Sequence, residues 1–497
     1  MKRILPFAVA GILACACTFS LSAWQFPLPE KFPSGVRVPS LDETYPNFVV
    51  RDGNAARLER VFAKGLRGEP IVVAVIGGSI TSGARASRRD LQWGAVLAEW
   101  FRHAFPKSEV TYVNAGIGAT GSNYAVHRVE ADVCAKNPDV VGVEFAVNDG
   151  DDASATEYNE GLIRHLLNCP TRPFVFQVSM MAKGCVNRMS RHLPVSEHYD
   201  IPHFSYRNAF FPLISAGKLA HTDLAKDELH PDDIGHPYVG ALVGRYLDGK
   251  LAAFKSANRA PAAIPPLPSK PLVGTTFDTG RVLTMADVKV LENKGFTRGA
   301  HARNYKWTKC GGLQADKPGS RFSVEIDAPT CAMLFFRING PMGKARVTVD
   351  GKEACVCDAW FSQTWGGYTP YQLLWRDKPG KHVVAVDVLE EKNPGSTGHA
   401  FEVDAFLPAG PYPHIKGNGG RFRKRKHLAC RISRHLIVKV QRRRGEARER
   451  DQARGVRHVR PAERSAVGVR RARQPLRRPQ RRRNMVRRDE PASTGGL

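Results

Sequence analysis

The chain has 497 residues, more than one ordinary domain holds, and its 42% hydrophobic content excludes wholesale disorder. Its formal net charge of +27 would favour a nucleic-acid partner if the charge were spread along the chain. However, residues 421–497 hold 27 Lys and Arg against 6 Asp and Glu, whereas residues 1–420 hold 47 against 41. The body of the protein is nearly neutral, so we expect no nucleic-acid partner for it.

The first 23 residues have the pattern of an export signal. Lys2 and Arg3 precede an apolar run from Ile4 to Ala16, and small residues follow near Ala23. The run is too short to span a bilayer as a helix, and no later segment is long enough, so we expect no transmembrane segment. The sequence around Cys15 loosely resembles a lipobox, which makes a lipid anchor at Cys15 the alternative to simple cleavage. Both alternatives predict a secreted, periplasmic or outer-surface protein.

Residues 45–255 alternate short apolar runs with amphipathic segments, as an α/β domain with a parallel sheet does. Residues 70–76 form a continuous apolar run rich in β-branched residues, which a strand buried on both faces requires. Residues 109–114, 139–146 and 173–180 repeat this pattern. Between the first two strands, Trp93, Trp100 and other apolar residues recur at helical spacing up to Pro106. We interpret both tryptophans as core residues.

Four motifs in this domain carry polar groups or glycines. Gly77-Gly78-Ser79 follows the first strand, where two glycines permit a tight turn that presents the serine hydroxyl. On its own, this motif is better explained as a plain glycine turn. A glycine-rich segment at 114–122 ends the second strand, and Asn148 follows the third. In the fourth motif, residues 227–236, Asp227 and His230 stand three residues apart, close enough for the carboxylate to reach one ring nitrogen.

In this order, the four motifs resemble those of the SGNH (GDSL-like) hydrolase superfamily, in its subset with GGSIT in place of GDSL. The resemblance covers residues 70 to about 245. It implies a flavodoxin-like three-layer sandwich with a parallel sheet. It also implies a serine mechanism, in which Ser79 is the nucleophile, His230 the base and Asp227 the group that orients the imidazole. No metal or organic cofactor is expected.

The resemblance also implies an oxyanion hole made of the Ser79 N–H, an N–H at Gly118 or Ala119, and the side-chain amide of Asn148. Two positions depart from the usual pattern of the family. Gly78 stands where Asp is usual, and Ala119 stands where a glycine usually falls. The second departure leaves open whether the N–H of Gly118 or that of Ala119 serves the site.

For other ionisable groups near the motifs, we expect no direct part in catalysis. Asp149, Asp151 and Asp152 are expected to form a solvated acidic loop and not a metal site. His236 is expected to pack against or cap the following helix. Glu144 lies within a strand and has no predicted role.

The rest of the chain divides into three parts. Residues 256–272 are rich in Pro and Ala, as a stiff linker is, and residues 273–409 alternate short strand patterns with turn dipeptides. The latter pattern predicts an all-β sandwich or jelly-roll domain. Residues 417–497 are Arg-rich and without periodicity, which predicts a disordered tail. Its composition indicates a spurious translation, with a nucleic-acid-binding arm as the alternative.

The predicted β domain resembles carbohydrate-binding jelly rolls by architecture, and it contains an aromatic cluster at residues 358–375. Aromatic faces grip sugar rings, and the candidates are Trp365, Trp360 and Tyr368, with core packing as the alternative. Seven cysteines fall in the body of the protein without a CxxC pair, so disulfides are permitted and a structural zinc is not indicated.

Taken together, the sequence predicts an exported serine esterase that removes acetyl or other short acyl groups from a polysaccharide or oligosaccharide. The alternatives are a lipolytic acyl hydrolase or thioesterase, a glycan O-acyltransferase with the same triad, and a non-catalytic glycan-binding protein.

Overall fold

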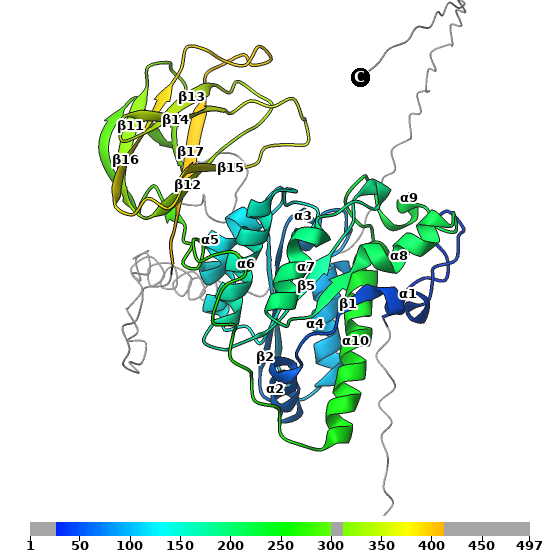
Figure 1. Cartoon of the computed structure of the whole chain (residues 1–497). Coiled ribbons are helices and arrows are strands. Elements are labelled where there is room, and N and C mark those ends of the chain that lie inside the picture. The colour runs from blue at the N-terminus through cyan, green and yellow to red at the C-terminus, as the bar shows by residue number, and fades with distance from the viewer. Residues whose placement is uncertain (1–25, 300–311, 412–497) are drawn as a thin grey trace, which may run out of the picture. The chain divides into compact units, whose positions relative to one another are not determined.

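The computed structural model describes residues 26–299 and 312–411 (Figure 1). The export signal predicted for residues 1–23, the alternative lipid anchor at Cys15 and the tail predicted for 417–497 lie outside the described residues. Within 26–299 and 312–411, no helix has both the length and the apolar character needed to cross a bilayer.

A six-stranded sheet forms the centre of the first domain. Its strands lie in the order β1-β6-β5-β4-β2-β3, and strands β2 to β6 run parallel. Their bounds are β1 Val49–Arg51, β2 Ile71–Gly77, β3 Val110–Gly116, β4 Val140–Glu144, β5 Phe174–Ser179 and β6 His203–Ser205. The short edge strand β1 pairs antiparallel with β6. The strand order reverses at β2, and such a reversal is where open α/β sheets place their ligands.

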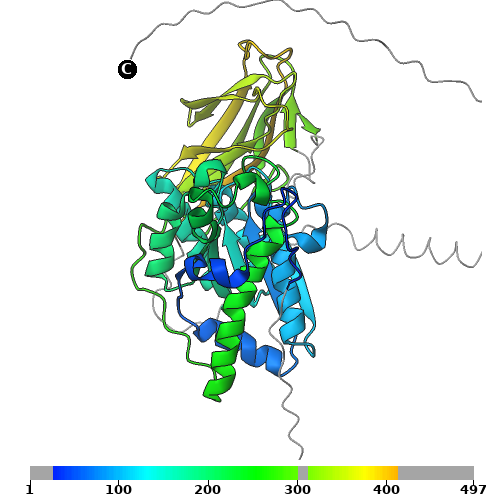
Figure 2. The same ribbon diagram turned by 90° about the vertical axis from the view of Figure 1, so that its right-hand side faces the viewer.

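Helices cover both faces of this sheet (Figure 1; Figure 2 shows the long green helix α10 lengthwise). The α-helices are α1 Leu41–Phe48, α2 Ala56–Leu66, α3 Ser79–Ser82, α4 Trp93–Ala104, α5 Ser122–Asp132, α6 Ala153–Leu167, α7 Met189–His198, α8 Tyr206–Ser215, α9 His221–Leu224 and α10 Gly235–Ala257. Short 3-10 turns are η1 Arg89–Leu91, η2 Cys134–Lys136 and η3 Lys183–Cys185. One core joins the sheet to α2, α4, α8 and α10, and the other joins it to α5, α6 and α7. The predicted α/β three-layer arrangement is therefore confirmed.

Trp93 and Trp100 are fully buried in the first of these cores, as expected from their helical spacing. The indole N–H of Trp100 donates to Asp248 on α10 at 2.8 Å. Without this contact, the buried ring would leave its one polar atom with no hydrogen-bond partner.

The second domain is an antiparallel β-sandwich. One sheet has the order β15-β12-β17-β10-β9, with β7 paired to β17, and the other has the order β14-β13-β16-β11-β8. The bounds are β7 Leu283–Thr284, β8 Lys289–Lys294, β9 Thr297–Gly299, β10 Gly312–Ala315, β11 Arg321–Asp327, β12 Thr330–Phe335, β13 Lys344–Val349, β14 Lys352–Asp358, β15 Tyr371–Trp375, β16 Lys381–Val388 and β17 Phe401–Ala409. Alternate side chains of both sheets share one core. The prediction of an all-β sandwich is confirmed.

The segment predicted as a linker packs against the first domain. Helix α10 runs to Ala257, so it includes the first two residues of the predicted linker. The N–H of Ala262 donates to Glu59 of α2 at 2.7 Å, and the N–H of Leu272 donates to Glu160 of α6. Both glutamates are buried, so the backbone of the segment supplies hydrogen bonds that their carboxylates need.

Ion pairs join residues of the second domain to helix α6 of the first domain. Arg164 of α6 makes a two-point contact with Asp278, at 2.7 and 2.9 Å, and Asp278 is almost fully buried. Arg376 contacts Glu157 of α6 at 2.7 Å. The bidentate, largely buried pair of Arg164 and Asp278 fixes orientation more firmly than an exposed pair would.

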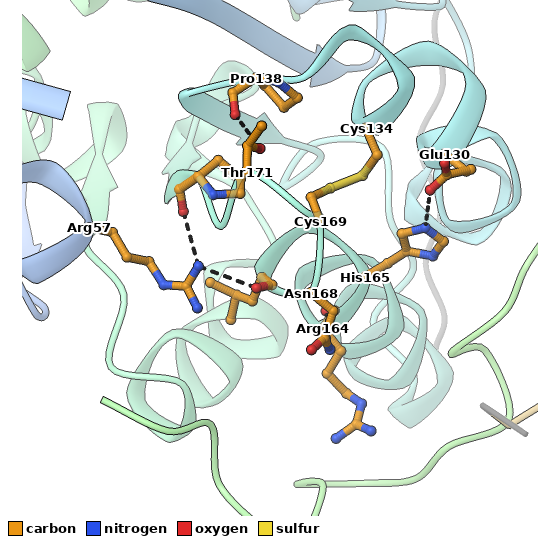
Figure 3. The surroundings of a disulfide bond; sticks show 11 residues. Arg57, Glu130, Cys134, Pro138, Arg164, His165, Asn168, Cys169 and Thr171 are labelled. Atoms are coloured by element: carbon orange, nitrogen blue, oxygen red, sulfur yellow. Dashed lines mark hydrogen bonds and ion pairs between the residues drawn. A yellow bond between two sulfur atoms is a disulfide. The ribbon is translucent and has the colours of Figure 1, made fainter. Parts of the chain in front are cut away.

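A disulfide links Cys134, in η2 after α5, to Cys169, just after α6 (Figure 3). The sequence permitted disulfides without specifying a pairing. Nearby, His165 contacts Glu130 at 3.0 Å, and Arg57 donates to the carbonyl of Leu167 at 3.2 Å (Figure 3). The bond therefore ties together the ends of two helices that cover the same face of the sheet.

Candidate active site

The side chains of Ser79, His230 and Asp227 contact one another in series. His230 Nε2 lies 2.8 Å from Ser79 Oγ, and His230 Nδ1 lies 3.0 Å from each carboxylate oxygen of Asp227. When Nδ1 donates its proton to the carboxylate, Nε2 presents a lone pair to the serine hydroxyl. The arrangement can therefore accept the proton of the hydroxyl as it attacks an acyl carbon.

Close packing explains the two glycines that precede Ser79. A Cβ atom at Gly77 would lie 2.1 Å from Thr81 Oγ1, and one at Gly78 would lie 2.2 Å from Asn148 Oδ1. Position 77 requires glycine, because the backbone carbonyl of Glu144 would also lie 2.6 Å from such a Cβ, whereas a side chain at position 78 would displace the Asn148 amide. The glycine that replaces the family's usual Asp at position 78 thus makes room for the Asn148 amide beside Ser79.

The loop that carries Asp227 and His230 is organised by the Asp227 carboxylate itself. Its Oδ1 accepts the N–H groups of Leu229 at 2.9 Å and His230 at 2.8 Å, and its Oδ2 accepts Nε of Arg85 at 2.8 Å. Burial alone would raise the pKa of Asp227, but these hydrogen bonds outweigh it and hold the pKa well below its usual range. Sequence reasoning did not identify Arg85, because 142 residues separate it from Asp227.

The expected oxyanion donors lie beside Ser79. Ser79 is the first residue of α3, a position whose N–H has no partner inside a helix. Among the backbone hydrogen bonds of the described residues, neither Gly118 nor Ala119 acts as a donor. Gly118 packs against Ser79, since a Cβ at Gly118 would lie 3.7 Å from Ser79 Cβ. Ala119 lines the adjoining cleft and has a φ of 58°, a left-handed conformation that favours the family's usual glycine.

A cleft of about 450 Å³ is lined by Ala119 and Asn148, but not by Ser79 or His230. Three segments line it: the loop after β3 into α5, the loop after β4 into α6, and the segment that leads into β15 of the sandwich. Residues that line it include Ala119, Asn123, Asn148, Tyr158, Tyr368 and Tyr371. The second domain therefore supplies part of the wall of the cleft that contains Asn148.

The three sugar-binding candidates lie in different surroundings. Tyr368 lines the cleft, and its ring centroid lies 5.6 Å from that of Trp365, whose residue is 52% exposed. Trp360 is partly buried, packs against the sandwich core and lies against Gly395. Phe361 completes an aromatic cluster with Trp365 and Tyr368. The rings of Tyr368 and Trp365 are thus partly open to solvent, whereas Trp360 packs against the core of the sandwich.

The expectation that Asp149 lies in a solvated loop is wrong. Its side chain is buried, its Oδ1 accepts the N–H of Ser122 at 2.7 Å, and its Oδ2 lies 2.8 Å from His192 Nε2. A carboxylate at this depth needs such partners, and they come from the start of α5 and from α7. Asp149 thereby ties the loop that carries Asn148 to the start of α5.

The neighbouring carboxylates fit the original expectation better. Asp151 forms an exposed ion pair with Arg191 at 3.2 Å, and Asp152 caps the N-terminus of α6 through the N–H of Ser154. His236 packs as expected: it is fully buried, and its Nε2 lies 3.0 Å from the carbonyl of Ala84.

Glu144 has a supporting contact that the sequence did not reveal. It is fully buried at the end of β4, and Thr81 Oγ1 of α3 donates to its Oε2 at 3.0 Å. Burial raises the pKa of Glu144 to about 7. The residue therefore braces the short helix that begins with Ser79.

A group of potential metal ligands lies away from this site. Glu130, Cys134 and His165 each place a ligand atom within 4.8 Å of the others. Because the sulfur of Cys134 belongs to the disulfide, the group offers only a carboxylate and an imidazole (Figure 3).

Solved structures provide the comparison with known proteins. No family model and no curated protein matches the sequence. A two-domain esterase active on acetylated mannans matches with a TM-score of 0.68 and 28% identity, covering 74% of this chain and 99% of that one. The same esterase co-crystallised with mannopentaose matches with a TM-score of 0.67 and the same identity and coverage. An acetylxylan esterase from Geobacillus stearothermophilus covers 36% of this chain, with a TM-score of 0.30 and 17% identity.

Proposed function

We propose that this chain, which has the SGNH hydrolase fold with an additional β-sandwich domain, is an exported serine esterase that removes acetyl groups from a polysaccharide. The observation that carries the proposal is the series Ser79–His230–Asp227, with contacts of 2.8 and 3.0 Å, beside a cleft that contains Asn148. The two-domain mannan esterase supports the substrate class, because the similarity extends over 99% of that protein.

In the proposed reaction, His230 Nε2 takes the proton of Ser79 while Oγ bonds to the acetyl carbon. The negative charge on the carbonyl oxygen is stabilised by the Ser79 N–H, an N–H of Gly118 or Ala119, and the Asn148 amide. As the C–O bond to the sugar breaks, His230 returns the proton to the sugar oxygen. His230 then deprotonates a water molecule that attacks the acyl-Ser79 intermediate, and acetate leaves as Ser79 regains its proton.

Two further observations support the proposed location and substrate. The Cys134–Cys169 disulfide suits an oxidising compartment, in agreement with the export signal proposed for residues 1–23. Tyr368 lines the same cleft as Asn148, so a sugar ring stacked on it would lie in the cleft that holds this proposed oxyanion donor.

Acetate release from a panel of acetylated glycans tests the proposal. We expect the wild-type protein to release acetate from acetylated mannan or another acetylated polysaccharide, and the Ser79→Ala variant to release none above background. The panel includes short-chain and long-chain lipid esters as well. Exclusive hydrolysis of long-chain esters would identify a lipase, and failure to release any acyl group would refute the esterase assignment.

We predict that Tyr368→Ala weakens the use of polymeric substrate selectively. Loss of an aromatic contact worth about 1 kcal/mol should raise KM for an acetylated oligosaccharide about fivefold. Activity on a small activated ester should stay unchanged, because such an ester does not reach Tyr368. The matched control is Phe211→Ala, which removes another exposed aromatic ring, on α8. An equal loss on both substrates would contradict a role in sugar binding.

A further inference from the structure

The loop that follows α3, residues 83–87, is hydrogen-bonded to the segment that supplies Asp227 and His230. Arg85 Nε donates to Asp227 Oδ2 at 2.8 Å, and the carbonyl of Ala84 accepts from His236 Nε2 at 3.0 Å. The N–H of Ser87 donates to Asp233 Oδ1 at 2.6 Å. These three contacts join residues 83–87, just after the nucleophile, to residues 227–236, about 150 positions later.

The contact of Arg85 differs from the ordinary surface ion pairs of this chain. Arg88, three positions later, pairs with Asp90, and both side chains are about two-thirds exposed. Arg85 instead pairs with the carboxylate that contacts His230. The backbone φ of Arg85 is 73°, a conformation that non-glycine residues seldom adopt, so the loop is held in a specific shape.

The two oxygens of Asp227 have different partners. Both oxygens lie 3.0 Å from His230 Nδ1, but Oδ1 also accepts two backbone N–H groups of its own loop, whereas the further partner of Oδ2 is Arg85. Without Arg85, the second oxygen would keep only the imidazole and water. The carboxylate could then rotate, and the imidazole that follows it would lose its alignment with Ser79.

We propose that Arg85 is a positioning residue that fixes the Asp227 carboxylate against His230 and so keeps the imidazole aligned on the Ser79 hydroxyl. This role rests on the proposed function, because it takes Ser79 as the nucleophile. The effect is moderate in size. The side chains of Arg85 and Asp227 are 57% and 30% exposed, so water replaces part of the lost interaction.

The experiment measures how fast Ser79 is phosphonylated by a fluorophosphonate, a reaction in which serine oxygen displaces fluoride without any sugar substrate. We expect Arg85→Ala to slow labelling about fivefold at neutral pH, the factor that corresponds to about 1 kcal/mol for an exposed pair. Arg85→Lys should recover part of the rate, and so should millimolar guanidinium ion added to Arg85→Ala. The matched control, Arg88→Ala, should leave the rate unchanged.

The pH profile of labelling adds a readout that a purely structural role would not move. Among the described residues, the charged and titratable side chains that contact the Asp227 carboxylate are those of Arg85 and His230, and His221 of α9 contacts only its main-chain carbonyl. Removing Arg85 takes away a hydrogen bond that lowers the pKa of Asp227. The carboxylate then takes up a proton at a higher pH, so the loss of labelling that follows protonation of Asp227 should begin at a higher pH than in the wild type.

The possible outcomes separate this proposal from the proposed function. Unchanged labelling in Arg85→Ala would overturn the positioning role. So would a loss that neither lysine nor guanidinium restores and that accompanies a lower melting temperature. If the wild type is not labelled at Ser79, both proposals fail. If it is labelled but releases no acetate from any glycan, only the substrate assignment fails.

Discussion

Replacement of Ser79 by alanine is expected to lower kcat for acetate release by about 10⁶-fold, the loss typical of removing the nucleophile from a serine hydrolase. The reason is geometric. The hydroxyl is the group that His230 contacts at 2.8 Å, and a methyl group cannot form the acyl intermediate. The measurement is the initial rate of acetate release from the best glycan of the panel, with the melting temperature recorded for each variant.

The same geometry predicts how a second substitution combines with the first. His230→Ala should cost nearly as much as Ser79→Ala, and the double variant should be no slower than either single variant, because the two groups act as one unit. The control is His103→Ala, which removes an exposed imidazole on α4. Additive losses in the double variant would contradict a shared proton transfer between Ser79 and His230.

Asn148→Ala is expected to lower kcat by about 10²–10³-fold and to change KM little, because the amide would act on charge that develops only in the transition state. The structure gives this amide no other task. Within the described residues its side chain makes no hydrogen bond, and its Oδ1 is buried against Gly78. A free amide N–H₂ group is therefore available to an oxyanion beside Ser79.

Two further variants sharpen this measurement. Asn148→Asp keeps the shape of the side chain but replaces a donor with a carboxylate, so it should lose at least as much activity as Asn148→Ala. Asn168→Ala removes an exposed amide at the end of α6 and should leave kcat unchanged. A loss in KM alone for Asn148→Ala would indicate that the amide binds the ground state of the substrate and does not stabilise the oxyanion.

The contacts around Asn148 show how the site is supported from several elements. Gly78 leaves the space that the amide fills. The buried Asp149, which follows Asn148 in the chain, contacts the start of α5 and His192. Glu144 accepts a hydrogen bond from Thr81 and so holds the helix that begins with Ser79. Pre-organised donors need such support, because a shift of about 1 Å can cost a large part of their effect.

Local pattern in the sequence was sufficient for most of the secondary structure. The strand predicted over 70–76 corresponds to β2, and the runs at 109–114 and 173–180 correspond to β3 and β5. Burial on one or both faces imposes a period that is readable along the chain, and turn chemistry is equally local. Asp350 and Gly351, for example, are one of the turn dipeptides of residues 273–409, and they join β13 to β14 with φ values of 51° and 77°.

Only the tertiary structure decided which distant groups meet. Nothing local marks Arg85 as the partner of Asp227, His192 as the partner of Asp149, or Cys169 as the partner of Cys134. The placement of Tyr368 in the same cleft as Asn148 likewise depends on how the sandwich packs against the first domain. The physical reason is that hydrophobic periodicity is set by neighbours in sequence, whereas ion pairs, disulfides and cleft walls depend on distance in space. Many different residues at those positions would have preserved the same periodicity.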